Sequence, residues 1–282
     1  LDDADDEADT KGTIIQLILE QELGDLLRTG DASQRKHVYR EMEKAILRSD
    51  VPLLCACVAP MFEAMCRDAS EVDAAEYQRV GHMKTLLRTD NTELKLELLD
   101  ELSQALRETN IESALTIIDL AWRDKRQPSE VRTAGMDALG RISYSLASSM
   151  DSWLKQGIEE HWELDVLREL RSSVAPELRT RFAAEPEPLG VSMALTLGKM
   201  RDWRSTDALA KYAEANAETP DARTHACLAA LGLSRDSQML GRLVAMAKPL
   251  YPSEAFTPLA YATGELTRHY APGMNDEIDA VF

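Results

Sequence analysis

Two stretches decide the fold: residues 197–213 read LGKMRDWRSTDALAKYA, and residues 231–247 read LGLSRDSQMLGRLVAMA. Six of the seventeen positions are identical at one offset, which is 34 residues when counted from Gly198 to Gly232. The shared residues include a Leu-Gly pair near the start and an Arg-Asp pair three residues after the glycine. A period of this length predicts a repeat protein in which each unit is one supersecondary element.

The repeat extends in both directions from this pair of stretches. Gly264 follows Gly232 by 32 residues. Upstream, residues 128–142 read PSEVRTAGMDALGRI and carry the same Ala-Leu-Gly ending, with Gly140 placed 58 residues before Gly198. The longer spacing leaves room for an irregular unit between two regular ones.

Helix signals recur along the chain from Thr13 onward, and no segment alternates apolar and polar residues as a half-buried strand does. The expected helix starts include Asn91 or Thr92, Asp151 and Ser205, because these side chains can accept hydrogen bonds from the first free amides of a helix. Together the signals divide the chain into about fourteen helices with short joints. The sequence therefore predicts an all-α fold.

Residues 128–142 resemble the second helix of a HEAT repeat, and in particular the short repeats of phycobilisome-lyase-like proteins. The residues that carry this likeness are Val131, Arg132, Ala134, Ala138, Leu139 and Gly140. Later units keep only parts of the pattern, since Thr224 stands in place of the arginine beside Arg223. The resemblance covers residues 112–270 and implies a right-handed α-solenoid of stacked antiparallel helix pairs.

Three segments are expected within this architecture. Residues 1–12 form an acidic tail or linker, residues 13–127 a helical half with degenerate repeats, and residues 128–282 the HEAT-like repeats that continue it as one solenoid. Alanines at three- and four-residue spacing allow neighbouring helices to approach closely. The glycine after each leucine is expected to end its helix at a sharp turn.

The charge of the chain restricts its partners. The net charge is −17, so the surface repels phosphate backbones, and we expect a basic or mixed-charge protein partner and no nucleic acid. Two basic clusters interrupt the acidity and are interpreted as solvated helix ends. They are Arg123, Lys125 and Arg126, and then Arg168, Arg171, Arg179 and Arg181.

The cysteines and the apolar runs of the sequence indicate where in the cell the chain is expected. Cys55, Cys57, Cys66 and Cys227 show no spacing typical of disulfide frameworks or zinc sites, which favours a reducing, cytoplasmic setting. No apolar run approaches the ~18 residues that a membrane span needs. We therefore expect no membrane segment within this stretch of chain.

Residue patterns that carry chemistry are missing from the sequence. None of the five histidines lies in an H-E-x-x-H arrangement, and the chain has no His-Glu dipeptide of the kind that supplies iron ligands in deoxyhypusine hydroxylase. There is also no P-loop, no G-x-G-x-x-G and no G-x-S-x-G. We predict no catalytic residue, no metal site and no bound cofactor, and hence no enzyme.

The leading hypothesis is a scaffold or adaptor that holds a protein along the concave face lined by the second helices of the repeats. Two alternatives stay open: a subunit similar to the phycobilin chromophore lyases, which share the repeat, and a nucleic-acid-binding solenoid. A shared scaffold does not determine function. The residues expected to contact the partner are Arg132, Asp137, Arg141, Lys199, Arg223 and His225.

Overall fold

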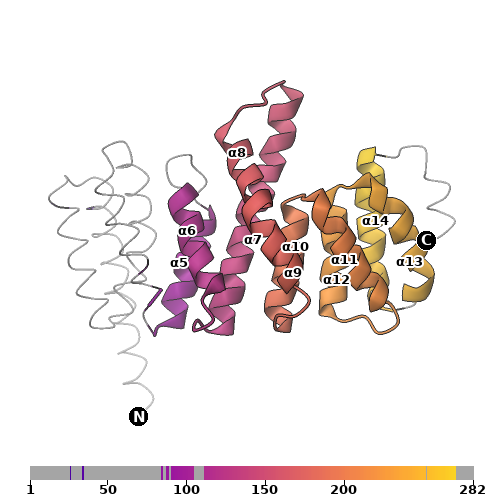
Figure 1. Cartoon of the computed structure of the whole chain (residues 1–282), viewed down its shortest axis with the longest axis horizontal. Coiled ribbons are helices and arrows are strands. Elements are labelled where there is room, and N and C mark those ends of the chain that lie inside the picture. Colours follow the sequence, from indigo (N-terminus) through magenta and orange to yellow (C-terminus); the bar gives the residue numbers. More distant parts are fainter. Residues whose placement is uncertain are drawn as a thin grey trace, which may run out of the picture. The chain divides into compact units, whose positions relative to one another are not determined.

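The computed structural model describes residues 90–104, 111–251 and 253–270, together with Leu26, Gln34, Lys84, Leu87 and Arg88 (Figure 1). All regular structure in this part of the chain is helical, and it contains no strand. The all-α prediction is confirmed for these residues. The predicted acidic tail at residues 1–12 and the helices predicted between residues 13 and 89 lie outside the described ranges.

The described helices follow one another with short connections. Two short segments depart from α-helical geometry, the π-helical η2 and the 3-10 helix η3. In chain order the elements are α5 (Thr92–Gln104), α6 (Ile111–Arg123), α7 (Ser129–Lys155), α8 (Trp162–Glu169), η2 (Leu170–Val174), α9 (Ala175–Arg181), α10 (Glu187–Lys199), α11 (Trp203–Ala215), α12 (Ala222–Ser234), η3 (Ser237–Met239), α13 (Leu240–Leu250) and α14 (Phe256–Tyr270).

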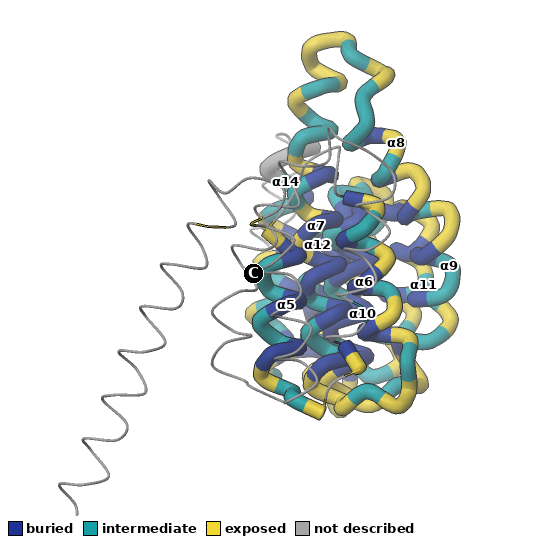
Figure 2. Tube along the Cα trace, turned by 90° about the vertical axis from the view of Figure 1, so that its left-hand side faces the viewer, coloured by how far each residue is buried: buried dark blue, intermediate teal, exposed yellow. Residues whose placement is uncertain are grey.

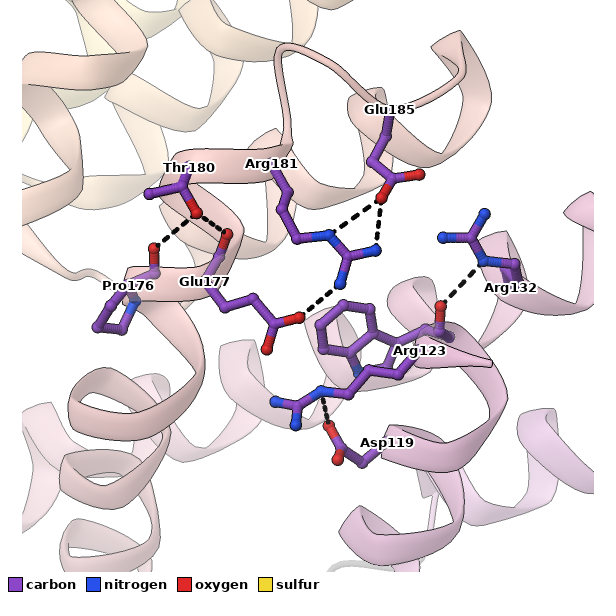
Figure 3. A network of polar contacts seen from close by, with 9 residues as sticks. Asp119, Arg123, Arg132, Pro176, Glu177, Thr180, Arg181 and Glu185 are labelled. Atoms are coloured by element: carbon purple, nitrogen blue, oxygen red, sulfur yellow. Dashed lines mark hydrogen bonds and ion pairs between the residues drawn. The ribbon is translucent and has the colours of Figure 1, made fainter. Parts of the chain in front are cut away.

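The chain divides into two compact units, Leu1–Gly135 and Met136–Phe282, and α7 passes from the first into the second. In the first unit, Trp122 of α6 is fully buried. Arg132 of α7 is buried as well, and its Nε donates a hydrogen bond to the carbonyl oxygen of Trp122 at 3.0 Å (Figure 3). This bond ties the first turn of α7 to the end of α6.

In the second unit the helices form two layers. Helix α12 packs against α10 on one side and α14 on the other, while α11 packs against α12 and α13 against α14. In Figure 1, α9, α11 and α13 accordingly lie in front of α10, α12 and α14. Buried residues dominate α10 and α12 in Figure 2, where α9 and α11 form the more exposed edge. We call α7 from Met136 onward, α10, α12 and α14 the second helices.

Three repeat glycines, Gly140, Gly198 and Gly232, each make a close contact with the next second helix. A Cβ atom built on Gly198 would lie 2.5 Å from the Cα and the carbonyl oxygen of Ala230, and one built on Gly232 would lie 2.7 Å from the Cα of Ala262. A Cβ atom built on Gly140 would lie 2.8 Å from the side-chain Oγ1 of Thr196.

The contacting residue holds one position in the repeat: in every case it lies two residues before the next glycine of the series Gly198, Gly232 and Gly264 (198 − 2 = 196, 232 − 2 = 230, 264 − 2 = 262). The sequence repeat is therefore a repeat of helix–helix contacts. At Gly198 and Gly232 glycine is needed because any side chain would push the two backbones apart.

The sharp turn expected at these glycines is made elsewhere, so that expectation was wrong. Arg201 and Arg235, which follow the glycines by three residues, have φ angles of 51° and 55° and occupy the left-handed region that normally favours glycine. Both guanidinium groups donate to the carboxylate of Asp151 on α7, Arg201 at 2.8 Å to Oδ1 and Arg235 to Oδ2. The ion pairs hold two helix ends against a third helix.

The predicted helix starts had mixed outcomes. Asn91 does cap α5, because its Oδ1 accepts a hydrogen bond from the amide of Leu94 at 3.0 Å. Asp151 does not cap a helix, because α7 continues through it to Lys155. Its carboxylate instead accepts hydrogen bonds from Arg201 and Arg235. Ser205 lies inside α11, where its hydroxyl donates to Oδ2 of Asp202, the residue that precedes the helix. Contacts with distant segments overrode the local capping signal at Asp151.

The glycine contact can be tested by adding a single methyl group. Gly198→Ala forces the new Cβ into the backbone of Ala230, and we expect the free energy of unfolding to fall by about 1–3 kcal/mol, as overpacking typically costs. Gly264→Ala is the matched control, because no heavy atom of the described chain lies within 4 Å of its Cβ position. That variant should gain up to about 1 kcal/mol from helix propensity. Urea unfolding measures both, and equal effects would refute the contact.

The Asp151 ion pairs predict a dependence of stability on pH. Burial by itself raises the pKa of Asp151, but the hydrogen bonds and charges of Arg201 and Arg235 outweigh it and hold the pKa below its ordinary value. A depressed folded-state pKa stabilises the protein above the unfolded-state pKa of ~3.9, and this stabilisation is lost as the pH falls further through the folded-state value.

Asp151→Asn should therefore lower the free energy of unfolding by about 1–2 kcal/mol at neutral pH. The difference from wild type should shrink once the pH falls below about 4. Urea unfolding of both proteins across this range makes the comparison. A difference that stays constant down to the acid end would mean that the carboxylate charge at this position contributes nothing.

Candidate functional site

Two of the second helices, α10 and α12, leave one line of residues uncovered. On α10, every residue from Leu189 to Met200 is buried except Val191, Leu195 and Lys199, which are half-buried. On α12, every residue from Arg223 to Ser234 is buried except His225, Ala229 and Leu233, which hold the same three repeat positions. The uncovered positions lie seven and three residues before the repeat glycine and one residue after it. Four-residue spacing places them along one side of each helix.

The lines of neighbouring helices lie on the same side of the layer. Consecutive residues of a helix are rotated by about 100°, so Lys199, just after Gly198, turns away from the contact line in one sense. Ala229, just before Ala230, turns in the opposite sense on the facing helix. Because the two helices face each other, these opposite rotations bring both residues to one side. Leu197 rotates the other way, toward the layer of α9 and α11, and is fully buried.

We call this surface the second-helix face and define it by the three repeat positions. All of its residues are half-buried or exposed. They are Asp137 and Arg141 on α7, Val191, Leu195 and Lys199 on α10, His225, Ala229 and Leu233 on α12, and Thr257, Tyr261 and Glu265 on α14.

Four of the six residues predicted to bind a partner lie on this face, and three of them are close together. Lys199 crosses Gly140 of α7, with its Nζ 3.3 Å from the Cβ position of that glycine. Its ammonium group feels the charges of Asp137 and Arg141. His225 is the fourth and lies on α12, where its Nε2 is buried without a hydrogen-bond partner in the described structure.

The other two predicted residues are buried anchors. Arg223 donates hydrogen bonds to the carbonyl oxygens of Ala183 at 2.5 Å and Glu185 at 2.7 Å, and its guanidinium carbon lies 5.8 Å from the centre of the Tyr212 ring. Arg132 holds the carbonyl of Trp122 in the first unit. Each is only 8% exposed, so these side chains hold the fold together in the described structure, and a binding role for them stays a prediction.

Sequence reasoning missed the apolar members of the face. Val191, Leu195, Ala229 and Leu233 look like core residues in an apolar helix, and only their common distance from the repeat glycine distinguishes them. That distance was available in the sequence. It could not be interpreted without knowing which side of the helix the glycine contact occupies.

Most of the predicted basic clusters are neutralised by nearby carboxylates. Arg181 lies between Glu177 and Glu185, at 2.5 Å from each, and Arg123 pairs with Asp119 at 2.9 Å (Figure 3). Similar local pairs join Arg126 to Asp124 and Arg168 to Asp165.

The described residues offer little support for chemistry. Cys227 is buried, and desolvation raises the pKa of its thiol to about 12, so it stays protonated at neutral pH and is a poor nucleophile. Within the same residues, no three His, Cys, Asp or Glu side chains gather closely enough to hold a metal ion. None of the helices there is both long and apolar enough to cross a bilayer.

Comparison with known proteins adds no family. No protein-family model matches the chain, and no curated protein sequence matches it.

The environment of Lys199 makes a prediction that spectroscopy can check. Burial lowers the pKa of Lys199, Asp137 opposes this effect, and Arg141 adds to it. In a titration followed by NMR of 13C-labelled lysine, the Lys199 signal should shift at a pH below the ordinary value of about 10.4. Asp137→Asn should lower this midpoint further, and Arg141→Gln should raise it. Opposite shifts in the two variants would contradict the arrangement.

Proposed function

We propose that this chain is a non-enzymatic scaffold that binds a protein partner on its second-helix face, and that its repeats stack as a HEAT-like, right-handed solenoid. The single observation that carries the proposal is the composition of the face. Its centre is apolar, with Val191, Leu195, Ala229 and Leu233 side by side on adjacent helices. Polar and charged residues occur toward α7 and α14. Protein interfaces have this organisation, an apolar core within a polar rim.

The charge of the face supports a mixed-charge protein partner. Asp137 and Glu265 offset Arg141 and Lys199, so the face is neutral when His225 is uncharged. A nucleic-acid site needs several phosphate contacts and an excess of positive charge. The partner proposed here instead places apolar side chains on α10 and α12. On either side of those apolar side chains, charged side chains of the partner, of both signs, contact the rim of the face.

One aromatic residue strengthens the proposal at one end of the face. Tyr261 on α14 is 56% exposed and occupies the same repeat position as Leu195 and Ala229. Tyrosine is enriched among the residues that dominate binding energy at protein interfaces. An exposed tyrosine in line with an apolar centre extends the area that a partner segment can cover.

Photo-crosslinking identifies the partner and tests the face in one experiment. A benzoylphenylalanine at Ala229 should crosslink a specific protein in an extract of the native source. The same group at Lys211, an exposed residue of α11 in the other layer, should not crosslink it. Mass spectrometry then names the partner for binding measurements. Equal crosslinking from both positions would count against the second-helix face.

Purified partner then allows a matched pair of variants. Lys199→Glu with Leu233→Glu alters the face, whereas Lys248→Glu with Leu154→Glu makes the same two changes at exposed positions elsewhere. We expect the first pair to weaken binding by at least about ten-fold, or about 1.4 kcal/mol, with circular dichroism confirming the fold. The second pair should leave affinity nearly unchanged. Equal affinities of the two variants would remove the proposed site.

A further inference from the structure

A second surface of different chemistry lies where α10 and α12 end. The two connections that follow these helices carry the repeated Arg-Asp pair, Arg201 with Asp202 and Arg235 with Asp236. Both arginines adopt the left-handed conformation and reach Asp151. Strained backbone of this kind costs about 1 kcal/mol or more per residue and is often found at binding sites.

Two more arginines join this cluster from the preceding elements. Arg171 of η2 donates through Nε to the carbonyl oxygen of Met200 at 2.7 Å, and Arg179 of α9 lies 3.5 Å from Oδ2 of Asp202. Arg171 is placed by a π-helical turn, a rare local geometry that occurs preferentially at functional sites.

An exposed aromatic residue stands beside the cluster. Trp203, which begins α11, is 68% exposed, and the guanidinium of Arg204 lies 5.4 Å from the centre of its ring. An indole in this position offers an apolar contact surface next to a cation, the combination that recurs at binding hot spots. We call Arg171, Arg179, Arg201, Arg204 and Arg235, together with Trp203, the arginine edge.

The charges of the arginine edge do not balance. Only two aspartates, Asp151 and Asp202, form ion pairs with its arginines among the residues that the structure describes, in a chain whose net charge is −17. Arg171 and Arg204 have no carboxylate within ion-pair distance among the residues that the structure describes. Arg171 is also half-buried; its guanidinium donates to the carbonyl oxygen of Met200, and the carboxylate charge that acts on it, that of Asp202, is also paired with Arg179.

We propose that the arginine edge binds an acidic segment of a polypeptide, whose carboxylates pair with Arg171 and Arg204 while an apolar side chain packs on Trp203. The guanidinium group suits this ligand because its planar fork donates two parallel hydrogen bonds to a carboxylate. This surface is distinct from the second-helix face in position and in charge, and it selects a different partner segment.

The same observations disfavour a nucleic acid as the ligand. Arg179, Arg201 and Arg235 are committed to aspartates, so only two arginines remain to meet an anion. The phosphates of a nucleic acid follow one another closely and require a longer run of cations. Two carboxylates and one apolar residue match two guanidinium groups, one of which lies beside the exposed indole.

Fluorescence anisotropy with labelled synthetic peptides tests the proposal on the full chain. One probe is a short peptide of Asp and Glu with a single phenylalanine, a second replaces its acidic residues by lysine, and a third is oligothymidylate. The acidic peptide should bind wild type, weaken with added salt, and bind better than either other probe. Absence of binding, or equal binding of oligothymidylate, would overturn the proposal.

Variants then locate the binding. Arg171→Glu with Arg204→Glu should weaken the acidic peptide by at least about ten-fold, because like charges now oppose each other. Trp203→Ala should weaken it as well, and Arg204→Glu alone keeps the test valid if loss of the Arg171 hydrogen bond lowers the melting temperature.

Two controls make a failure interpretable. Lys248→Glu, an exposed charge reversal elsewhere, should have little effect on peptide binding. Lys199→Glu with Leu233→Glu should also leave peptide binding intact, so a failure of the second-helix face and a failure of the arginine edge give different results. Full binding by the arginine and tryptophan variants would place the peptide elsewhere and refute the site.

Discussion

Close backbone contact at the repeat glycines is the constraint on which the described architecture of the second unit depends. At Gly198 and Gly232 there is no room for even a methyl group between one second helix and the next. This contact fixes the spacing and rotation of neighbouring helices together. Once the rotation is fixed, the residues on one flank of each contact are buried, and on α10 and α12 only every fourth residue on the other flank remains half-buried.

The uncovered residues can therefore vary without disturbing the packing. Lys199, Leu233 and Arg141 share one position of the repeat yet differ in charge and polarity, whereas their glycine neighbours are the same. Such a division lets a regular array present an irregular chemical surface, which is how repeat proteins recognise partners. The helix ends provide a second, independent place for chemistry, because their arginines are directed by the left-handed turns and by Asp151.

Local features of the sequence predicted local features of the structure, and little beyond them. The repeat offset, the helical content and the cap at Asn91 could be predicted because each depends on residues a few positions apart. The roles of Arg223 and Asp151 could not, since their partners lie 38 to 84 residues away. Arg223 was expected on the surface, but it is buried and donates hydrogen bonds to the carbonyl groups of Ala183 and Glu185. The apolar part of the face was missed because, in the sequence, a half-buried leucine cannot be distinguished from a leucine of the core.

The most direct measurement of the central claim is the pattern of nuclear Overhauser effects between repeat glycines and methyl groups of the next helix. In protein with labelled alanine methyls, the α-protons of Gly198 should show a strong effect to the methyl of Ala230, and those of Gly232 to the methyl of Ala262. Gly264 should show none to any alanine of the other described helices. Absence of the first two effects, in a protein whose helical content is intact, would contradict the account.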